Sequence, residues 1–209
     1  MKNEAGSNEA RAEELCLDCG LCCNGVIFAR VQLQAEDKAV RLHALGLPVS
    51  KRASTRAQPP AGPHNSPALG CNLSAPAPSL VPVASLRGGY FPQPCAAWEG
   101  CRCRIYAERP QYCRQFECTL LKSLKAGRMQ RHDALEIIKN ARQRAEKVRR
   151  LLAESGDSDE HLALSIRFRR TSRRLEKSGL TEETAATFGE LTLAVHDLNL
   201  LLSQAFYPG

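Results

Sequence analysis

The sequence predicts a mainly α-helical, loop-rich protein, in which a small domain stapled by metal-bound cysteines precedes an α-helical hairpin or three-helix region. Three observations predict this fold class. Cysteines gather in two groups, within residues 16–23 and 95–118. Ten of the twelve prolines fall within residues 48–94. Residues 130–207 contain neither cysteine nor proline, and their apolar side chains recur at steps of three and four, the period of an amphipathic helix.

The composition limits the class of protein. The chain has 209 residues, enough for one or two small domains, and its net charge of +7 is spread along its length, so it argues only weakly for a polyanionic partner. The first residues are polar, and no run approaches the ~18 apolar residues of a membrane span. We therefore expect a cytoplasmic protein with no membrane partner. In a reducing cytoplasm, clustered cysteines indicate metal ligands or redox groups.

Three parts follow from this pattern. Residues 1–15 are charged and small, and we expect them to form a flexible tail. Residues 16–119 are the predicted cysteine-cluster metal-binding domain. Its Pro-rich stretch, residues 48–94, has no periodicity, which predicts a partly disordered insertion. Residues 120–209 are the predicted α-helical C-terminal region.

Short elements are predicted inside the cysteine domain. Residues 26–33 are β-branched and partly alternating, which favours a strand, and residues 35–45 have helical apolar spacing. A strand or hairpin is predicted near Gly88. Pro110 suits the first position of a helix, where its missing N–H costs little, and that helix is predicted to run to about Leu124.

The C-terminal region is predicted to form three antiparallel helices. The first carries one apolar stripe, formed by Ala134, Ile138, Ala141, Ala145, Val148 and Leu152. The second is predicted over residues 159–177, with inward side chains at Leu162, Ile166 and Leu175. The third follows Thr181, a good N-cap, and its predicted stripe consists of Phe188, Leu191, Val195, Leu198, Leu202 and Phe206.

The last helix also has apolar residues outside its stripe, at Leu193, Leu200 and Leu201. We therefore expect it to be sandwiched between neighbours. The surplus apolar surface should pack onto the cysteine domain or form a dimer interface, and packing onto the cysteine domain is favoured because the helix after Pro110 leads directly into the bundle.

The first cysteine group has the spacing of a metal-binding loop. Cys16-x-x-Cys19-x-x-Cys22 matches the spacing of cubane iron–sulfur loops, whose fourth cysteine can come from elsewhere in the chain. Cys22 and Cys23 are adjacent, so in an extended chain their side chains point to opposite sides. Such a pair suits two centres, or two edges of one cluster. The ligand set should therefore be completed by thiols from residues 95–118.

Both cysteine groups belong to one long and specific pattern. It reads Cys16-x-x-Cys19-Gly20-x-Cys22-Cys23, Pro94-Cys95 and Cys103-x-Ile105-Tyr106-x-x-Arg109-Pro110-x-x-Cys113-Arg114-x-Phe116-x-Cys118. This pattern resembles the YkgJ-like cysteine-cluster family, described as zinc- or iron-chelating proteins, and covers residues 16–119 apart from the insertion. The resemblance implies metal chelation by Cys16, Cys19, Cys22, Cys23, Cys95, Cys103, Cys113 and Cys118. Cys71 and Cys101 fall outside it.

The alternatives to metal binding explain the cysteines poorly. Buried free thiols do not account for their density, disulfides do not suit a reducing compartment, and a Cys22–Cys23 bridge would be strained. We prefer an iron–sulfur cluster to zinc because of the spacing in the first group. Four arginines lie among the cysteines and could offset thiolate charge, unless they are simply solvated: Arg102, Arg104, Arg109 and Arg114.

The leading functional hypothesis is a non-enzymatic metal-cluster protein with a structural, metal-handling or electron-transfer role. The alternatives are a metal-dependent protein-modifying enzyme, because a similar cluster occurs in flagellin lysine-N-methylases, and a zinc-stabilised nucleic-acid-binding module. No phosphate loop, paired catalytic carboxylates or serine triad marks a catalytic site. The basic run 167–174 is expected to be a solvated helix face, which makes a nucleic-acid partner the weaker option. Metal ions are the expected partners, and a protein partner could bind through the C-terminal helices.

Overall fold

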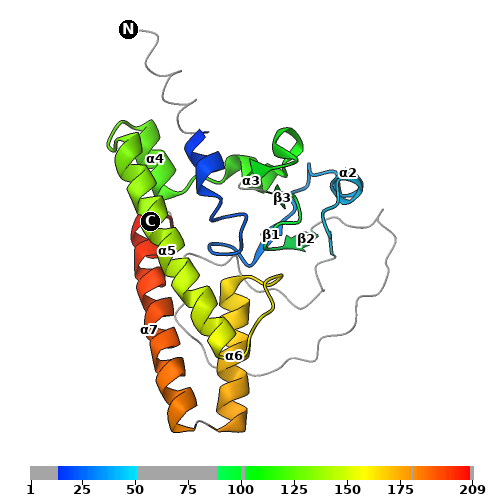
Figure 1. Cartoon of the computed structure of the whole chain (residues 1–209). Coiled ribbons are helices and arrows are strands. Elements are labelled where there is room, and N and C mark those ends of the chain that lie inside the picture. Colours follow the sequence, from blue (N-terminus) through cyan, green and yellow to red (C-terminus); the bar gives the residue numbers. More distant parts are fainter. Residues whose placement is uncertain (1–13, 51–88, 100–101, 180, 208–209) are drawn as a thin grey trace.

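The computed structural model describes residues 14–50, 89–99, 102–179 and 181–207. The predicted tail, apart from its last two residues, lies outside the described residues, as do most of the Pro-rich insertion, Cys71 and Cys101. The protein is mainly helical, as predicted, and has a loop-rich region carrying the short elements beside a group of long helices (Figure 1). None of the described helices is both long enough and apolar enough to cross a membrane.

The loop-rich region contains two small antiparallel sheets. Strand β1 (Arg30–Gln32) pairs with β2 (Tyr90–Pro92), and β3 (Trp98–Glu99) pairs with β4 (Arg102–Cys103). The first pairing joins the segment before the Pro-rich stretch to the last residues of that stretch. The predicted strand 26–33 is therefore correct only over its last part, because Val26 and Ile27 turn into the core and the Ile27 amide bonds the Leu21 carbonyl at 3.1 Å.

Two predicted helices are shorter or broken. Helix α2 covers Ala39–Ala44 only, because an Asp37 carboxylate oxygen accepts the Gln34 amide at 2.8 Å and so closes a turn before it. The single helix predicted after Pro110 is wrong. It is two helices, α3 (Gln111–Gln115) and α4 (Thr119–Lys125), separated by extended backbone, and a 3-10 turn η2 (Tyr106–Glu108) precedes them.

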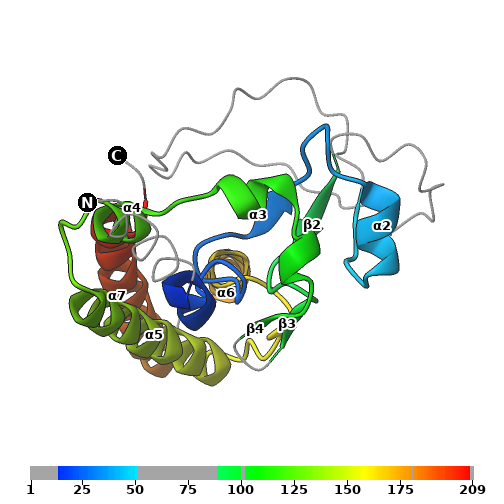
Figure 2. The same cartoon turned by 90° about the horizontal axis from the view of Figure 1, so that it is seen from above.

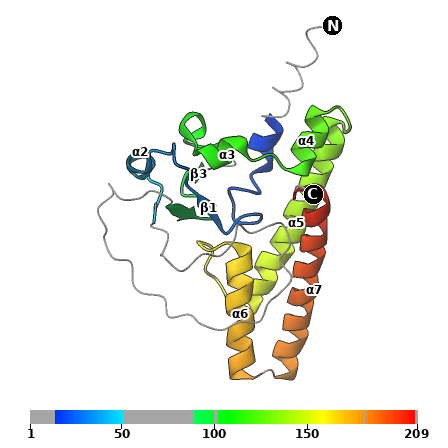
Figure 3. The same cartoon turned by 180° about the vertical axis from the view of Figure 1, so that it is seen from behind.

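The long helices are α5 (Arg131–Glu154), α6 (Leu164–Ser178) and α7 (Glu182–Ala205). Helices α5 and α7 run antiparallel along one side of the molecule, and α6 lies beside them (Figures 1 and 3). All six stripe residues predicted on α5 are buried. Thr181 caps α7 as predicted, in a reciprocal capping box with Thr184.

The buried face of α7 agrees largely with the prediction. The opposite face was expected to be covered by neighbouring elements, and it is exposed. Four predicted stripe residues are buried: Leu191, Leu198, Leu202 and Phe206. Phe188 and Val195 are half-buried. The expectation that α7 is sandwiched is wrong, because Leu193 is 70% exposed and Leu200 46% exposed on its outer face.

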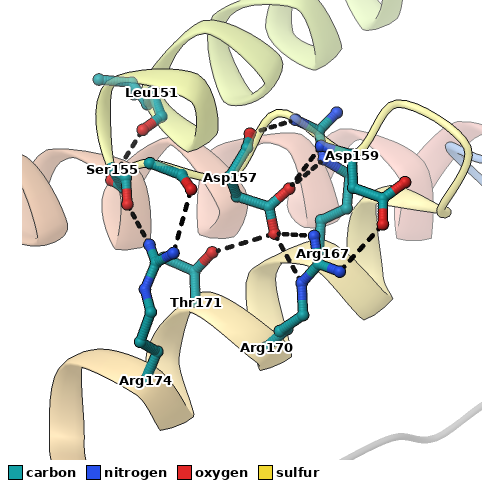
Figure 4. Close-up of polar contacts among 9 residues, drawn as sticks. Leu151, Ser155, Asp157, Asp159, Arg167, Arg170, Thr171 and Arg174 are labelled. Carbon is teal, nitrogen blue, oxygen red and sulfur yellow. Dashed lines mark hydrogen bonds and ion pairs between the residues drawn. The ribbon is translucent and has the colours of Figure 1, made fainter.

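The prediction for α6 is wrong in both its start and its buried face. The helix begins at Leu164, and the buried side chains are Leu164, Arg167 and Thr171, instead of the three apolar residues predicted to point inward. The cause is Asp157, a buried carboxylate in the α5–α6 loop (Figure 4). Arg167 Nε donates to Asp157 Oδ1 at 3.1 Å, and Arg170 Nη2 donates to Oδ2 at 2.7 Å. This loop therefore selects which face of α6 is turned inward.

One apolar core joins the long helices to the first cysteine loop. It includes Leu15, Leu21, Val26 and Ile27 together with the buried residues of α4, α5, α6 and α7. The Leu164 amide at the start of α6 donates to the Gly25 carbonyl at 3.0 Å. Figure 2 shows the helical segment 14–19, in dark blue, between α5 and the α3 side of the molecule. The C-terminal helices thus pack onto the first cysteine loop, but the surplus apolar residues of α7 that were expected to make this contact, Leu193 and Leu200, stay exposed.

Candidate metal centre

The eight predicted ligands all lie within the described residues, and the fold separates them. Cys19, Cys22 and Cys118 pack against the large core of the long helices. Cys95, Cys103 and Cys113 pack instead against a second, smaller core around β1, β2 and α2. Cys16 shares the helical segment 14–19 with Cys19, and the Cys23 carbonyl accepts the Cys95 amide at 2.8 Å, so we assign the eight thiols to two groups of four. We call Cys16, Cys19, Cys22 and Cys118 centre 1, and Cys23, Cys95, Cys103 and Cys113 centre 2.

Centre 1 is built on the tight turn of the first loop. The Gly20 amide donates to the Cys16 carbonyl at 3.4 Å, and the Cys23 amide donates to the Gly20 carbonyl at 2.9 Å. Gly20 has a φ of +61°, and a Cβ there would overlap the Trp98 indole, so only glycine fits. Cys16 and Cys19 are three positions apart on the helical segment 14–19, and the turn at Gly20 leads from that segment to Cys22.

The fourth thiol of centre 1 comes from the start of α4. Cys118 is the N-cap residue, and its Sγ accepts the Leu121 amide at 3.4 Å. Burial, with a smaller contribution from the neighbouring Cys118 and Cys16, raises the pKa of Cys19 to about 12. The pKa of Cys22 is also raised well above its ordinary value, by burial first and then by Cys19 and Cys16.

Centre 2 draws each thiol from a different segment. The Cys95 amide donates to the Cys23 carbonyl at 2.8 Å, which joins the first loop to the β3–β4 hairpin, and Cys103 lies opposite Trp98 in that hairpin. Burial raises the pKa of Cys23, and Cys95, Cys113 and Cys103 raise it further. Burial also raises the pKa of Cys113 to about 12, with Cys95 and Cys103 adding to the effect.

The adjacent pair Cys22–Cys23 divides between the two centres. The main thiol neighbours of Cys22 are Cys19 and Cys16, whereas the main neighbours of Cys23 are Cys95 and Cys113. The chain is not extended here, as the sequence argument assumed: residues 21–25 form a turn, in which the Cys23 and Asn24 amides both donate to the Gly20 carbonyl. The break between α3 and α4 has a similar effect, because it places Cys113 in centre 2 and Cys118 in centre 1.

An aromatic cluster lies between the centres. Phe28 meets Phe116 edge to face at 4.8 Å and Tyr112 at 5.6 Å between ring centroids. Burial raises the pKa of Tyr112, and the nearby Cys22 and Cys113, one from each centre, raise it further. Phe116, Phe28 and Tyr112 therefore form an aromatic cluster next to thiols of both centres. Tyr106 does not take part in this cluster, because its ring stacks under the Arg109 guanidinium at 3.8 Å.

The donor set fits a thiolate-bound metal. Two groups of four thiols match the ligand number of a zinc ion or a cubane cluster. Burial raises the thiol pKa values, so thiolates in these positions call for a compensating cation. Within the described ranges, no three His, Cys, Asp or Glu side chains already stand in the geometry of a bound ion. Binding would therefore require the sulfurs of each group to draw closer together.

The arginines predicted to compensate charge act at a distance. Arg104 donates to Glu99 at 3.1 Å and to the Leu45 carbonyl at 3.2 Å, while Arg114 donates to the Arg109 carbonyl at 2.8 Å. Arg104 nevertheless acts against the rise in the pKa of Cys95 that burial causes, and Arg109 does the same at Cys113. Arg102 is exposed on β4.

The sequence analysis missed two arginines of α5. Arg142 Nη2 donates to the Cys19 carbonyl at 3.0 Å and also to the Asp18 carbonyl. Arg131 Nη2 lies 2.8 Å from the Asp18 carboxylate. These arginines are more than a hundred positions along the chain from the loop that they hold, and no spacing in the sequence links them to it.

Comparison with known proteins adds no relative. No protein-family model matches the sequence, and searches of the curated proteins and of the solved structures likewise give no match.

Proposed function

We propose that this chain binds metal at two four-cysteine centres and acts as a non-enzymatic metal-cluster protein, with a structural, metal-handling or electron-transfer role. The observation that carries the proposal is that the fold gathers the predicted ligands around two cores: Cys19, Cys22 and Cys118 pack against the large one, and Cys95, Cys103 and Cys113 against the small one. Each group alone supplies the ligands of one zinc ion or one cubane cluster. The resemblance to the YkgJ-like family supports the same ligands.

Iron–sulfur remains the preferred occupant of centre 1. Three of its thiols follow the Cys-x-x-Cys-x-x-Cys spacing, and its fourth is Cys118, far along the chain, as that class of loop allows. Centre 2 has no such spacing, because its four thiols come from four segments. A four-thiolate zinc site suits it equally well.

The experiment is anaerobic purification followed by metal analysis, acid-labile sulfide analysis and visible absorption. We expect two occupied centres for each chain, brown with sulfide where a cluster is bound and colourless where zinc is bound. Matched serine variants distinguish the centres: Cys19→Ser should remove the metal of centre 1 alone, and Cys113→Ser that of centre 2 alone. If both variants lose the same single metal, there is one mixed site and the two-centre proposal is wrong.

The nucleic-acid alternative is disfavoured by what the basic run on α6 contacts. Arg167 and Arg170 bond Asp157, and Arg174 donates to the Gly156 carbonyl at 3.0 Å. These guanidinium groups fix the α5–α6 loop instead of forming a row of unoccupied cations. No described feature favours the modifying-enzyme alternative. A protein partner at the C-terminal helices stays a prediction, for which the exposed Leu193 and Leu200 on α7 are the candidate surface.

A further inference from the structure

A groove of about 860 Å³ lies between the helical segment 14–19 and α5. It is lined by residues of that segment, by Arg102 of β4 and by one face of α5, and its lining contains none of the eight described thiols. A second hollow of about 420 Å³ shares Lys139 and Gln143 with it. The two hollows therefore adjoin along α5, and together they suit an elongated occupant.

The apolar part of the groove comes from Leu17, Leu135 and Ile138. Ile138 is buried in the large core, whereas Leu17 and Leu135 are half-buried and keep part of their apolar surface exposed. Covering this surface with an apolar side chain removes it from water, which favours binding. The groove can therefore hold an aliphatic or aromatic side chain of its occupant.

The two carboxylates of the groove both lie beside Arg131. Its Nη2 is 2.8 Å from the Asp18 carboxylate and 3.9 Å from the Glu14 carboxylate. Its Nε is buried and has no acceptor among the described residues, so this guanidinium has donor capacity left. The negative charge of the lining is thus used at Arg131.

Three further cations line the groove: Arg102, Lys139 and Arg142. Arg142 donates to two backbone carbonyls, which carry no net charge, and Arg102 is exposed on β4. Lys139 is 64% exposed, and its ion pair with Glu136 of the same helix is long, at 3.7 Å. An exposed pair of this kind holds a lysine weakly. The lining therefore has four cations against two carboxylates, and its uncompensated charge is positive.

This mixture of charges and apolar surface selects among occupants. A nucleic-acid strand would bring phosphates to the Asp18 and Glu14 carboxylates and would leave the apolar part uncovered. A small anion would use one end of the groove only. An acidic peptide that also carries a large apolar side chain matches both parts of the lining and its length.

We propose that this groove docks an acidic peptide segment of a partner protein. The segment places an apolar side chain on Leu17 and Leu135, and its carboxylates meet Arg102, Lys139 and Arg142. This surface is separate from the exposed leucines of α7. The inference goes beyond the metal-binding function and holds whether or not the centres carry metal.

The test is fluorescence anisotropy of labelled peptides with the full chain at low ionic strength. The probes are about twelve residues long, enough for a helix of about 18 Å. The first contains glutamate, leucine and alanine in an amphipathic helical pattern. The second has glutamine in place of each glutamate, and the third has serine in place of each leucine. We expect the first to bind at least about 10-fold more tightly than either of the others.

Two charge reversals on α5 locate the binding. Lys139→Glu should weaken binding of the first peptide by about 10-fold, because a favourable charge contact becomes repulsive. Arg150→Glu is the matched control. Arg150 is also 64% exposed and also pairs with a glutamate of α5 at 3.7 Å, but it lies outside the groove, so its reversal should leave the affinity nearly unchanged.

Four results would overturn the proposal. They are no binding of the first peptide at about 1 mM, equal affinity for the glutamine peptide, equal weakening by the two charge reversals, and tighter binding of a single-stranded DNA of similar length that Lys139→Glu abolishes. Metal content and far-UV circular dichroism of both variants should match those of the unaltered chain. The outcome is therefore independent of the two-centre proposal.

Discussion

Removing the Asp157 carboxylate should lower the free energy of unfolding by about 3–5 kcal/mol, the range for breaking a buried ion pair from one side. Its side chain is 1% exposed, and that of its partner Arg167 is 3% exposed. In Asp157→Ala the Arg167 guanidinium stays buried and keeps only its bond to the residue 157 carbonyl, at 2.7 Å. Because whole domains are stable by only about 5–15 kcal/mol, a loss of this size is easily measured.

The assay is urea denaturation of the metal-loaded chain, followed by far-UV circular dichroism. Asp159→Ala is the matched control in the same loop. The Asp159 side chain is 39% exposed and accepts one bond from Arg170 at 3.0 Å, so its loss should cost no more than about 1 kcal/mol. Equal losses in the two variants, or a loss under about 1 kcal/mol in Asp157→Ala, would refute the structural role of the buried pair.

The same carboxylate predicts a pH dependence. Burial would raise the pKa of Asp157, but hydrogen bonds from Arg170 and Arg167 outweigh it, and the pKa lies below its ordinary value of 3.8. A lowered pKa contributes stability that is complete above the ordinary value and is lost as the pH falls through the folded-state value. Asp157→Asn has no group to titrate here. Its stability should therefore fall less steeply below pH 3.8 than that of the unaltered chain.

Three further outcomes are expected. Complete chelation should abolish hydrogen-exchange protection around centre 2 while α5 and α7 keep their helicity; unchanged protection would show that the small core folds without metal, although a structural metal typically supplies ~10–16 kcal/mol. Gly20→Ala should lower the metal content of centre 1. The control is Gly127→Ala, also at positive φ but with no neighbour within 4 Å, which should only lower the thermal midpoint slightly. Equal effects of the two variants would show that the Gly20–Trp98 contact has no role. Leu198→Ala should cost about 2–5 kcal/mol, and Leu193→Ala, at 70% exposure, under about 0.5 kcal/mol in dilute protein; a larger loss at Leu193 that grows with protein concentration would identify α7 as a dimer interface.

The helices that could be predicted are those whose own sequence determines their buried face. The stripe on α5 runs uninterrupted through a 24-residue helix, and all its residues are buried as predicted. On α6 the apolar period gave the wrong face, because a carboxylate from the preceding loop holds Arg167 inside. The sequence predicts that an arginine in a basic run is solvated. Arg167 is buried instead because Asp157 lies beside it in the folded chain, and the sequence does not show this proximity.

The bounds of the short helices were predicted incorrectly because local side-chain hydrogen bonds change the backbone at their ends. The Asp37 carboxylate accepts a hydrogen bond from the Gln34 amide and closes a turn just before α2. Such a local side-chain bond competes with helix formation, and the spacing of apolar residues does not reveal it. The helix after Pro110 breaks where Cys118 becomes an N-cap. Serine, threonine, aspartate and asparagine are the residues usually found at a helix N-cap. The sequence therefore did not indicate that a cysteine would cap α4.

For the candidate site, the sequence predicted the residues and half of their arrangement. The adjacency of Cys22 and Cys23 suggested two centres or two edges of one cluster, and the ligand set was expected to be completed from residues 95–118. The sequence could not assign Cys118 to centre 1 and Cys113 to centre 2, because this assignment depends on where α4 packs in the folded chain. The hydrogen bond from Arg142 to the Cys19 carbonyl could not be predicted for the same reason, since it forms only when α5 packs beside the first cysteine segment.

The first loop connects the two cores because of the Cys22–Cys23 adjacency. Leu21 is buried in the large core, and the carbonyl of Cys23 accepts the Cys95 amide on the side of the small core. Gly25 then meets the start of α6 so closely that a Cβ would lie 3.0 Å from the Ala163 Cα. The loop is therefore held on one side by the large core and α6 and on the other by the segment that carries Cys95. The helical segment 14–19 ahead of it is also anchored, because Leu15 is buried in the large core and Arg142 holds the Cys19 carbonyl.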